Sequence, residues 1–187
     1  MLQAARRKIE EEPPQVRHLI TLRKADVRSF DLRETFPYIY FPSYTFDHLL
    51  TKEDQLSALH CIRCHLRSGG VYAFDLAHVK EEESSSSWFV QRKDLGGGCM
   101  VVRSGFHRAN PTARKSSIDL FYDVYVDGRM MERYHEHGEV YIYTPDQIRE
   151  LLEEAGLRVI AFYGDHYKAP FTEKSESMVI ITEKGEE

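Results

Sequence analysis

A helix between two short apolar runs most constrains the fold of this 187-residue chain. Residues Thr51–Leu66 carry apolar side chains at helical spacing, and Thr51 is placed to cap the first turn. Ser68-Gly69-Gly70 predicts the end of that helix. The flanking runs, Tyr38–Phe41 and Val71–Phe74, lack clean alternation, which is typical of strands covered on both faces. A strand, a helix and a strand in this order form a right-handed crossover, so we expect a parallel sheet in this part of the chain.

After Asp75 the pattern changes to one of antiparallel strands. Asp127-Gly128 favours a tight hairpin turn, because both positions tolerate positive φ. Gly96-Gly97-Gly98 lies between two predicted strands and is therefore interpreted as a turn. We expect a single domain over residues 1–187, with an antiparallel insertion from about residue 84 to 143. An acidic, serine-rich linker precedes four runs rich in Val, Tyr and Phe: Trp88–Lys93, Cys99–His107, Ile118–Val126 and Met130–Tyr143.

The two ends of the chain add further elements. Residues 2–11 are helix formers stopped by Pro13-Pro14, and Leu19–Arg23 is a β-branched run that predicts a strand. Thr144-Pro145-Asp146-Gln147 supplies a cap, a first-turn proline and a capping-box partner for a helix ending at Gly156. Two final strands are expected at Leu157–Tyr163 and Met178–Thr182.

Composition excludes several classes of function. A net charge of -5 and a pI near 6 leave no basic surface for nucleic acid, so none is expected as a partner. No run of eighteen apolar residues occurs, and the charged N-terminus does not resemble a signal peptide, so we expect no membrane association and a cytoplasmic protein. Three cysteines are too few for a disulfide framework and are interpreted as free thiols.

Two motifs suggest metal chemistry but have simpler explanations. Cys61-Ile62-Arg63-Cys64-His65 matches a haem-attachment sequence, yet it falls within a predicted amphipathic helix that separates the two thiols. No second ligand pair follows at zinc spacing. His135-Glu136-His137 places two imidazoles on one face of a strand, where a polar sheet face is favoured over a metal site. We therefore expect no metal. Tyr134 and His135 remain candidates for contacting an acceptor molecule.

Four segments, in this order and spacing, resemble the class I S-adenosylmethionine-dependent methyltransferases. The resemblance implies an α/β fold with a Rossmann-like sheet, S-adenosylmethionine as cofactor, and methyl transfer to a nitrogen or oxygen of a small-molecule acceptor. The segments are Lys24-Ala25-Asp26-Val27-Arg28, Tyr40–Leu50, Leu66–Val71 and Tyr143–Leu157.

The same resemblance implies a cofactor site. It places Asp26 at the adenine amino group and the backbone of Val27 along the ring, and it places the loop Phe41, Pro42, Ser43 and Tyr44 at the sulfonium and the acceptor. Adenine offers an exocyclic donor to a carboxylate, and aromatic rings suit a sulfonium cation. The alternatives are a solvated turn residue at Asp26 and a half-buried loop aromatic at Tyr44.

Catalysis by methyl transfer depends mainly on proximity, with at most one base. Tyr44 and His48 are the candidates, since His48 lies near the predicted methyl site and is able to accept a proton. His48 is equally suited to capping local backbone.

The departure from the family pattern concerns the first part of its fold. Neither the glycine-rich cofactor turn nor the second strand with its acidic residue is present, and Met1 corresponds to a position inside the second crossover helix. In the family's sheet the two absent strands lie between Leu19–Arg23 and Tyr38–Phe41, so their loss exposes edges. A homodimer is the simplest way to cover these exposed edges. The alternative is that the strand Leu19–Arg23 shifts sideways and pairs with Tyr38–Phe41 in the same chain. The chain is expected to be either an N-terminally incomplete enzyme or a non-catalytic subunit that acts by association.

Overall fold

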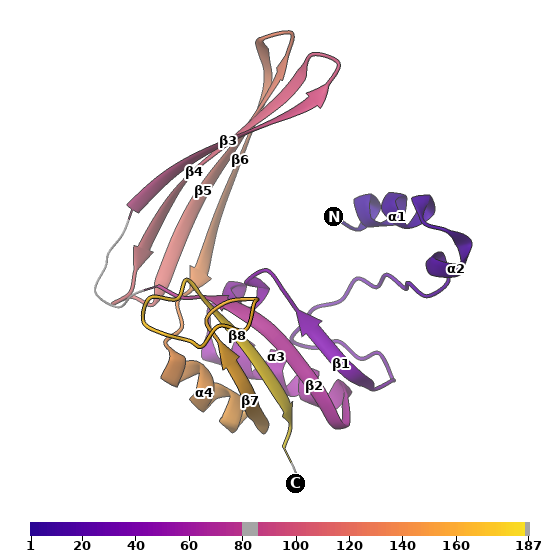
Figure 1. The fold of residues 1–187 in the computed structure, drawn as a ribbon, viewed down its shortest axis with the longest axis vertical. Coiled ribbons are helices and arrows are strands. Elements are labelled where there is room, and N and C mark those ends of the chain that lie inside the picture. Colours follow the sequence, from indigo (N-terminus) through magenta and orange to yellow (C-terminus); the bar gives the residue numbers. More distant parts are fainter. Residues whose placement is uncertain (80–85, 186–187) are drawn as a thin grey trace.

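The computed structural model describes residues 1–79 and 86–185, which form two four-stranded sheets and four α-helices (Figure 1). Part of the predicted acidic linker lies outside these residues. The first sheet has the order β1-β2-β8-β7 and the second β3-β4-β5-β6. The elements are α1 Leu2–Glu11, α2 Pro14–Arg17, β1 Phe36–Phe41, the 3-10 turn η1 Thr45–His48, α3 Lys52–His65, β2 Leu66–Ala77, β3 Ser86–Gly96, β4 Cys99–Asn110, β5 Lys115–Val126, β6 Arg129–Tyr141, α4 Pro145–Glu154, β7 Leu157–Tyr163 and β8 Ser177–Lys184.

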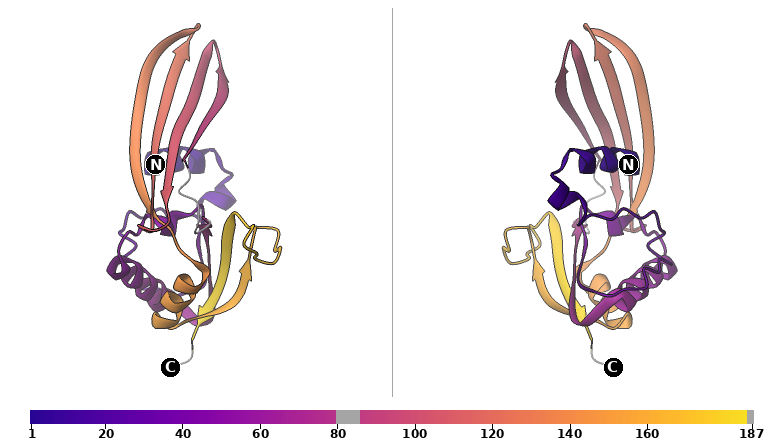
Figure 2. Two further views of the ribbon diagram at one scale, coloured as in Figure 1. Left: turned by 90° about the vertical axis from the view of Figure 1, so that its left-hand side faces the viewer. Right: turned by 90° about the vertical axis from the view of Figure 1, so that its right-hand side faces the viewer.

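The first sheet is mixed, as the crossover pattern predicts. β1 and β2 are parallel and joined through α3, whereas β8 runs antiparallel to both β2 and β7. Helices α3 and α4 lie on the same face of this sheet (Figure 2). The core forms between that face and the helices, and includes Leu59 and Ile62 of α3, Phe74 of β2, Leu152 of α4 and Ile180 of β8.

Local signals at the helix ends are confirmed. The Thr51 side chain accepts a hydrogen bond from the Asp54 backbone N–H, and Thr144 and Gln147 form the predicted capping box. Gly156 follows α4 with a φ of 72°, in the left-handed region that glycine adopts without steric cost. These contacts involve neighbours in the sequence, so a short window of residues is enough to predict them.

The junction between α3 and β2 differs from the prediction. The helix ends at His65 and β2 begins at once at Leu66, so Ser68-Gly69-Gly70 lies inside the strand. Register with β1 jumps from Phe36–Leu66 to Tyr38–Val71, so the extra residues on β2 form an irregularity around these glycines. A Cβ at Gly70 would lie 2.9 Å from the carbonyl oxygen of Arg67, which explains why a side chain does not fit.

The second sheet is the predicted antiparallel insertion and extends away from the α/β body (Figure 1). Gly97 and Gly98 turn the chain between β3 and β4 with φ values of 59° and 75°. Asp127 and Gly128 do the same between β5 and β6, with φ values of 48° and 77°. Both hairpin predictions are therefore confirmed.

The predicted strand at Leu19–Arg23 is wrong. This segment lies outside the strands of the structure, and Leu19 is 74% exposed. The proposed sideways shift is also wrong, because β1 is hydrogen-bonded to β2 alone among the described residues. A β-branched run becomes a strand only when a neighbouring backbone takes its N–H and C=O groups.

The N-terminal helices stand apart from both sheets, on the side of β1 (Figures 1 and 2). The apolar stripe of α1 consists of Leu2, Ala5 and Ile9, and no residue of α1 or α2 is buried. In the described ranges, no helix is long and apolar enough to cross a membrane.

Candidate functional site

The loop after β1 has an unusual backbone. Ser43 and Tyr44 both adopt left-handed conformations, with φ values of 64° and 55°. For a residue with a side chain this conformation costs about 1–2 kcal/mol. Two such residues in succession, at the carboxyl end of a parallel strand, mark a loop held by its surroundings, and strain of this kind clusters at functional sites.

Tyr44 is held by contacts to two other strands. Its backbone N–H lies 3.4 Å from Oδ1 of Asp75, near the end of β2, and its hydroxyl lies 2.8 Å from Oγ of Ser177, the first residue of β8. Asp75 and Ser177 are both buried, whereas Tyr44 is 38% exposed. Tyr44 is therefore held at its backbone and at its hydroxyl, while part of its side chain stays open to solvent.

A histidine shares the Asp75 carboxylate with Tyr44. Nε2 of His166, in the loop between β7 and β8, lies 3.3 Å from Oδ2 of Asp75. The His166 side chain is 55% exposed and that of Asp75 is 5% exposed. A carboxylate that orients an exposed imidazole is a common arrangement for a general base.

Asp47 anchors the turn that follows this loop. It is 2% exposed, and its Oδ2 accepts a hydrogen bond from the Ala77 backbone N–H at 3.1 Å. Burial raises the pKa of Asp47 to about 8; the hydrogen bond from Ala77 opposes this shift, and the Asp75 carboxylate adds to it. Three buried oxygens, Oδ1 of Asp47 and the hydroxyls of Tyr72 and Tyr143, lack hydrogen-bond partners among the described residues.

The predicted loop residues come together at this end of the sheet. Phe41 packs against the core, with its ring 6.5 Å from that of Phe46, and the carbonyl of Pro42 accepts a hydrogen bond from Thr45 Oγ1 at 2.5 Å. Ser43 is exposed, and His48 ends η1 with its side chain exposed. Their roles in binding and catalysis remain predictions.

Asp26 occupies an exposed turn and already has a cationic partner. Its carboxylate accepts hydrogen bonds from Nε and Nη2 of Arg28 at 2.9 and 2.6 Å, and Arg28 also contacts Asp54 of α3 at 2.9 Å. Hydrogen bonds from Arg28 lower the pKa of Asp26 to about 2. Val27 packs against the core. A ligand that binds Asp26 would therefore share the carboxylate with Arg28.

Tyr134 and His135 lie on β6, away from this loop. They are neighbours in one strand, so their side chains point to opposite faces of the sheet. Tyr134 lies seven positions before the end of β6 at Tyr141, a distance of about 23 Å along the strand. The structure thus does not bring them together with Tyr44.

Each of these two residues has its own surroundings on the antiparallel sheet. Nε2 of His135 lies 2.8 Å from Oδ1 of Asp119, and Nδ1 of His137 lies 3.0 Å from the same atom. No group of His, Cys, Asp or Glu within the described residues is arranged to hold a metal ion. Tyr134 pairs with Tyr122, which borders a shallow hollow of about 600 Å³ together with Leu95.

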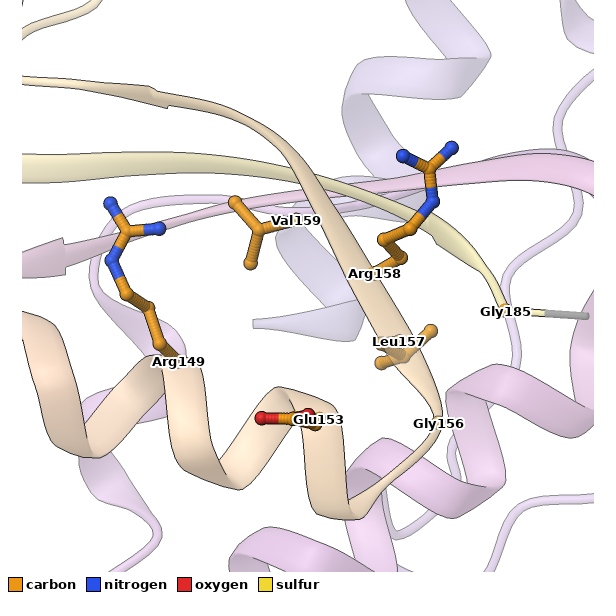
Figure 3. Close-up of a pocket in the computed structure, with 7 residues that line it drawn as sticks. All are labelled: Arg149, Glu153, Gly156, Leu157, Arg158, Val159 and Gly185. Carbon is orange, nitrogen blue, oxygen red and sulfur yellow. The ribbon is translucent and has the colours of Figure 1, made fainter.

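A cavity of about 370 Å³ lies elsewhere, between α4 and β7 (Figure 3). Its two arginines already have partners: Arg149 lies over the Phe162 ring at 4.2 Å, and Arg158 pairs with Glu183. β7 and β1 form opposite edges of the sheet. This cavity is therefore separate from the Ser43–Tyr44 loop.

Asp75, His166 and Ser177 were not predicted from the sequence. Asp75 had a usable signal, since it follows a buried parallel run whose carboxyl end faces the same edge as that of β1. His166 and Ser177 had none, because they lie in and just after the loop that follows β7, and only the full sheet topology shows that β7 runs in the same direction as β2 and ends at the same edge.

The chain has the fold of the S-adenosylmethionine-dependent methyltransferases. A methyltransferase of this type from Clostridium acetobutylicum superposes with a TM-score of 0.74 at 16% identity, covering 87% of this chain and 63% of that one. CcbJ, a methyltransferase from Streptomyces caelestis, gives 0.76 at 15% identity, covering 97% and 69%. The glycopeptide N-methyltransferase MtfA, in complex with S-adenosylmethionine, gives 0.58 at 20% identity, covering 97% and 72%.

This likeness is structural only. No protein-family model matches the sequence, and no curated protein matches it. The chain spans between about three fifths and three quarters of the length of the methyltransferases it resembles.

Proposed function

We infer that this chain takes part in methyl transfer from S-adenosylmethionine to a nitrogen or oxygen atom of a small molecule. The observation that carries the proposal is the strained Ser43–Tyr44 loop, fixed by Asp75 and Ser177 at the carboxyl end of β1. In a sheet of this kind, ligands bind beyond the carboxyl ends of the parallel strands. The glycopeptide N-methyltransferase described above supports a nitrogen acceptor.

The residues at this edge suit such a cofactor. When bound, S-adenosylmethionine supplies an electrophilic methyl group on a sulfonium. Phe41, Pro42, Ser43 and Tyr44 carry no charge, and aromatic rings attract a cation without being alkylated. The nearby Asp75 carboxylate is buried and already engaged by Tyr44 and His166. Asp26 and Val27 are proposed for the adenine end.

The chain's own residues would orient the acceptor and accept its proton. Tyr44 and His48 are the proposed bases, and His166 joins them because Asp75 orients its ring. Proximity to the methyl group supplies most of the rate, so one of these groups is sufficient. Tyr134 and His135 are proposed acceptor contacts only if the antiparallel sheet approaches this edge.

A non-catalytic subunit is the second candidate. It is favoured by the large aromatic and aliphatic side chains that the antiparallel sheet exposes, among them Trp88, Val90 and Tyr134. In this case the fold would act through association and would not need to bind the cofactor.

Cofactor binding distinguishes the two functions. We predict that S-adenosylhomocysteine binds this chain more weakly than micromolar, because Asp26 and the Phe41–Tyr44 loop supply only part of a full set of contacts. The measurement is a two-dimensional amide NMR titration up to millimolar ligand. Shifts confined to residues 26–28 and 41–44 are expected. An absence of shifts, or shifts centred on the α4–β7 cavity, contradicts the proposed cofactor site.

An Asp26→Ala variant tests the adenine contact within the same titration. Loss of a charged acceptor should weaken binding by about tenfold or more. Asp94→Ala is the matched control, because Asp94 is also an exposed carboxylate paired with an arginine two residues away, Arg92. Equal affinity of the Asp26→Ala variant and the unchanged chain would remove Asp26 from the site.

A further inference from the structure

One face of the antiparallel sheet carries an arginine in contact with two aromatic rings. Cζ of Arg103, in β4, lies 5.0 Å from the centre of the Phe89 ring in β3 and 6.0 Å from that of the Tyr122 ring in β5. Phe89 pairs with Gly105, where a Cβ would lie 2.5 Å from the Phe89 ring. Because Gly105 has no side chain, this ring is able to lie across the sheet beside Arg103.

Arg103 has unused donors and no acidic partner. Its Nη1 donates to Oε1 of Gln91 at 3.2 Å, while its Nε is shielded from solvent and has no hydrogen-bond partner among the described residues. No carboxylate in the described part of the chain forms an ion pair with Arg103. A guanidinium recognises a carboxylate through two parallel N–H···O bonds, and the single bond to Gln91 leaves enough donors for such a pair.

The arginine borders a hollow of about 600 Å³, a size typical of small-molecule sites. The lining residues are basic, apolar or aromatic, and none is acidic; they include Arg92, Lys93, Arg103, Leu95, Val101 and Tyr122. Arg92 pairs with Asp94 at 3.1 Å, whereas no carboxylate of the described residues pairs with Lys93. The hollow therefore combines an apolar surface with two cations that lack a counter-charge.

The acidic residues of this face lie on a different strand. Gln91 is directly opposite Arg103, and Lys93 is opposite Val101, so these side chains share one face of the sheet. Glu132 and Glu136 share that face, but they belong to β6, and β5 separates β6 from β4. The positive charge of the hollow is therefore not neutralised within its own strands.

We propose that this hollow binds a small organic anion with a planar apolar body, such as an aromatic carboxylate. The carboxylate would accept hydrogen bonds from Arg103, and Lys93 would add a second positive charge. The apolar body would pack against Tyr122, Leu95 and Val101, a contact that an inorganic anion does not make. The hollow lies on the sheet that extends away from the α/β body (Figure 1), and the proposal does not depend on methyl transfer.

A two-dimensional amide NMR titration with 2-naphthoate tests the site. Saturable shifts are expected in residues 91–95, 101–103 and 122. The neutral analogue 2-naphthamide has the same rings and no charge, so it should bind at least about tenfold more weakly. Acetate and inorganic phosphate, which lack the rings, should also bind at least about tenfold more weakly.

Arg103→Met tests the role of the guanidinium. Methionine still packs against the two rings but offers no donor and no charge, so the affinity for 2-naphthoate should fall at least about tenfold. Arg108→Met is the matched control, because Cζ of Arg108 also lies over an aromatic ring, that of Phe106, at 5.5 Å. Arg108 is on the same strand but belongs to the opposite face, since Phe106 pairs with Trp88 and not with Phe89.

Each outcome decides the proposal. Weaker binding in Arg103→Met alone supports it, whereas equal loss in both variants, loss in neither, or an absence of saturable shifts overturns it. The two naphthyl ligands are compared on the unchanged chain, so this reading does not depend on how the variants fold. Equal affinity for 2-naphthoate and 2-naphthamide would show that the hollow does not recognise the charge. Equal affinity for 2-naphthoate and phosphate or acetate would show only a general attraction of anions, and either result also overturns the proposal.

Discussion

At the scale of single residues, Asp47 is the clearest case of a group whose ionisation depends on the fold. The carboxyl is buried in the turn η1 that follows Ser43 and Tyr44, and one of its oxygens has no hydrogen-bond partner in the described chain. Its pKa is about 8, against an ordinary value of 3.8. Between these pH values the folded chain holds a proton on Asp47 that the unfolded chain has released.

This difference predicts a pH-dependent stability. Because the folded-state pKa is raised, the contribution of Asp47 to stability is fully present below about pH 4 and is lost as pH rises to about 8. The slope is about 1.4 kcal/mol per pH unit within that window. Asp47→Asn keeps an oxygen that can accept from the Ala77 N–H and removes the titration. Urea unfolding at pH 5, 6 and 7 should show a flatter dependence in the variant than in the unchanged chain, and parallel curves would contradict the burial argument.

The residues at this edge also show what a sequence can reveal about a site. Ser43 and Tyr44 come two residues after a strand ends, so family resemblance was enough to predict a site role for their loop without knowledge of the fold, and that role stays a prediction. Asp75 is recognisable only once β1 and β2 are known to be parallel neighbours. His166 reaches the same carboxylate from a loop 91 positions further along the chain. Contacts between residues so far apart in the chain depend on the full topology, so a local sequence pattern does not predict them.

At the scale of elements, helix ends are determined locally and strands are not. Thr51 and Thr144 cap their helices through atoms three residues away, and both caps were predicted. Leu19–Arg23 has the composition of a strand, but no neighbouring backbone is available to pair with it in the described structure. Its composition is therefore insufficient, because strand formation depends on a partner that the run itself does not specify.

The local nature of the α4 cap makes its energetic effect predictable. Thr144→Ala removes the oxygen that accepts from the Gln147 N–H, so the free energy of unfolding should fall by about 1 kcal/mol. Thr21→Ala is the control, since Thr21 is exposed and lies outside the helices and strands. Denaturant unfolding of both variants measures the difference. Equal stability of the two variants would show that the capping box does not stabilise α4.

At the scale of the whole molecule, the two sheets differ in how much they bury. The first sheet packs against α3 and α4, and Tyr72, Phe74, Met178 and Ile180 are almost completely buried. The second sheet buries Gly105, Ala109, Ser116 and Asp123 in its described strands, and leaves Trp88 66% exposed. Its strands are joined by regular hydrogen bonds, yet they have little apolar surface removed from water.

This contrast predicts two levels of local stability. Hydrophobic burial supplies most of the stabilisation of a sheet, so the second sheet should open without unfolding the first. In native-state hydrogen exchange at low protein concentration, amides of β2 and β8 should exchange only through global unfolding. Amides of β3 and β6, at the edges of the second sheet, should exchange through smaller openings with a weak dependence on denaturant. Equal opening free energies for both sheets would mean that the antiparallel sheet unfolds together with the α/β body, despite its small buried surface.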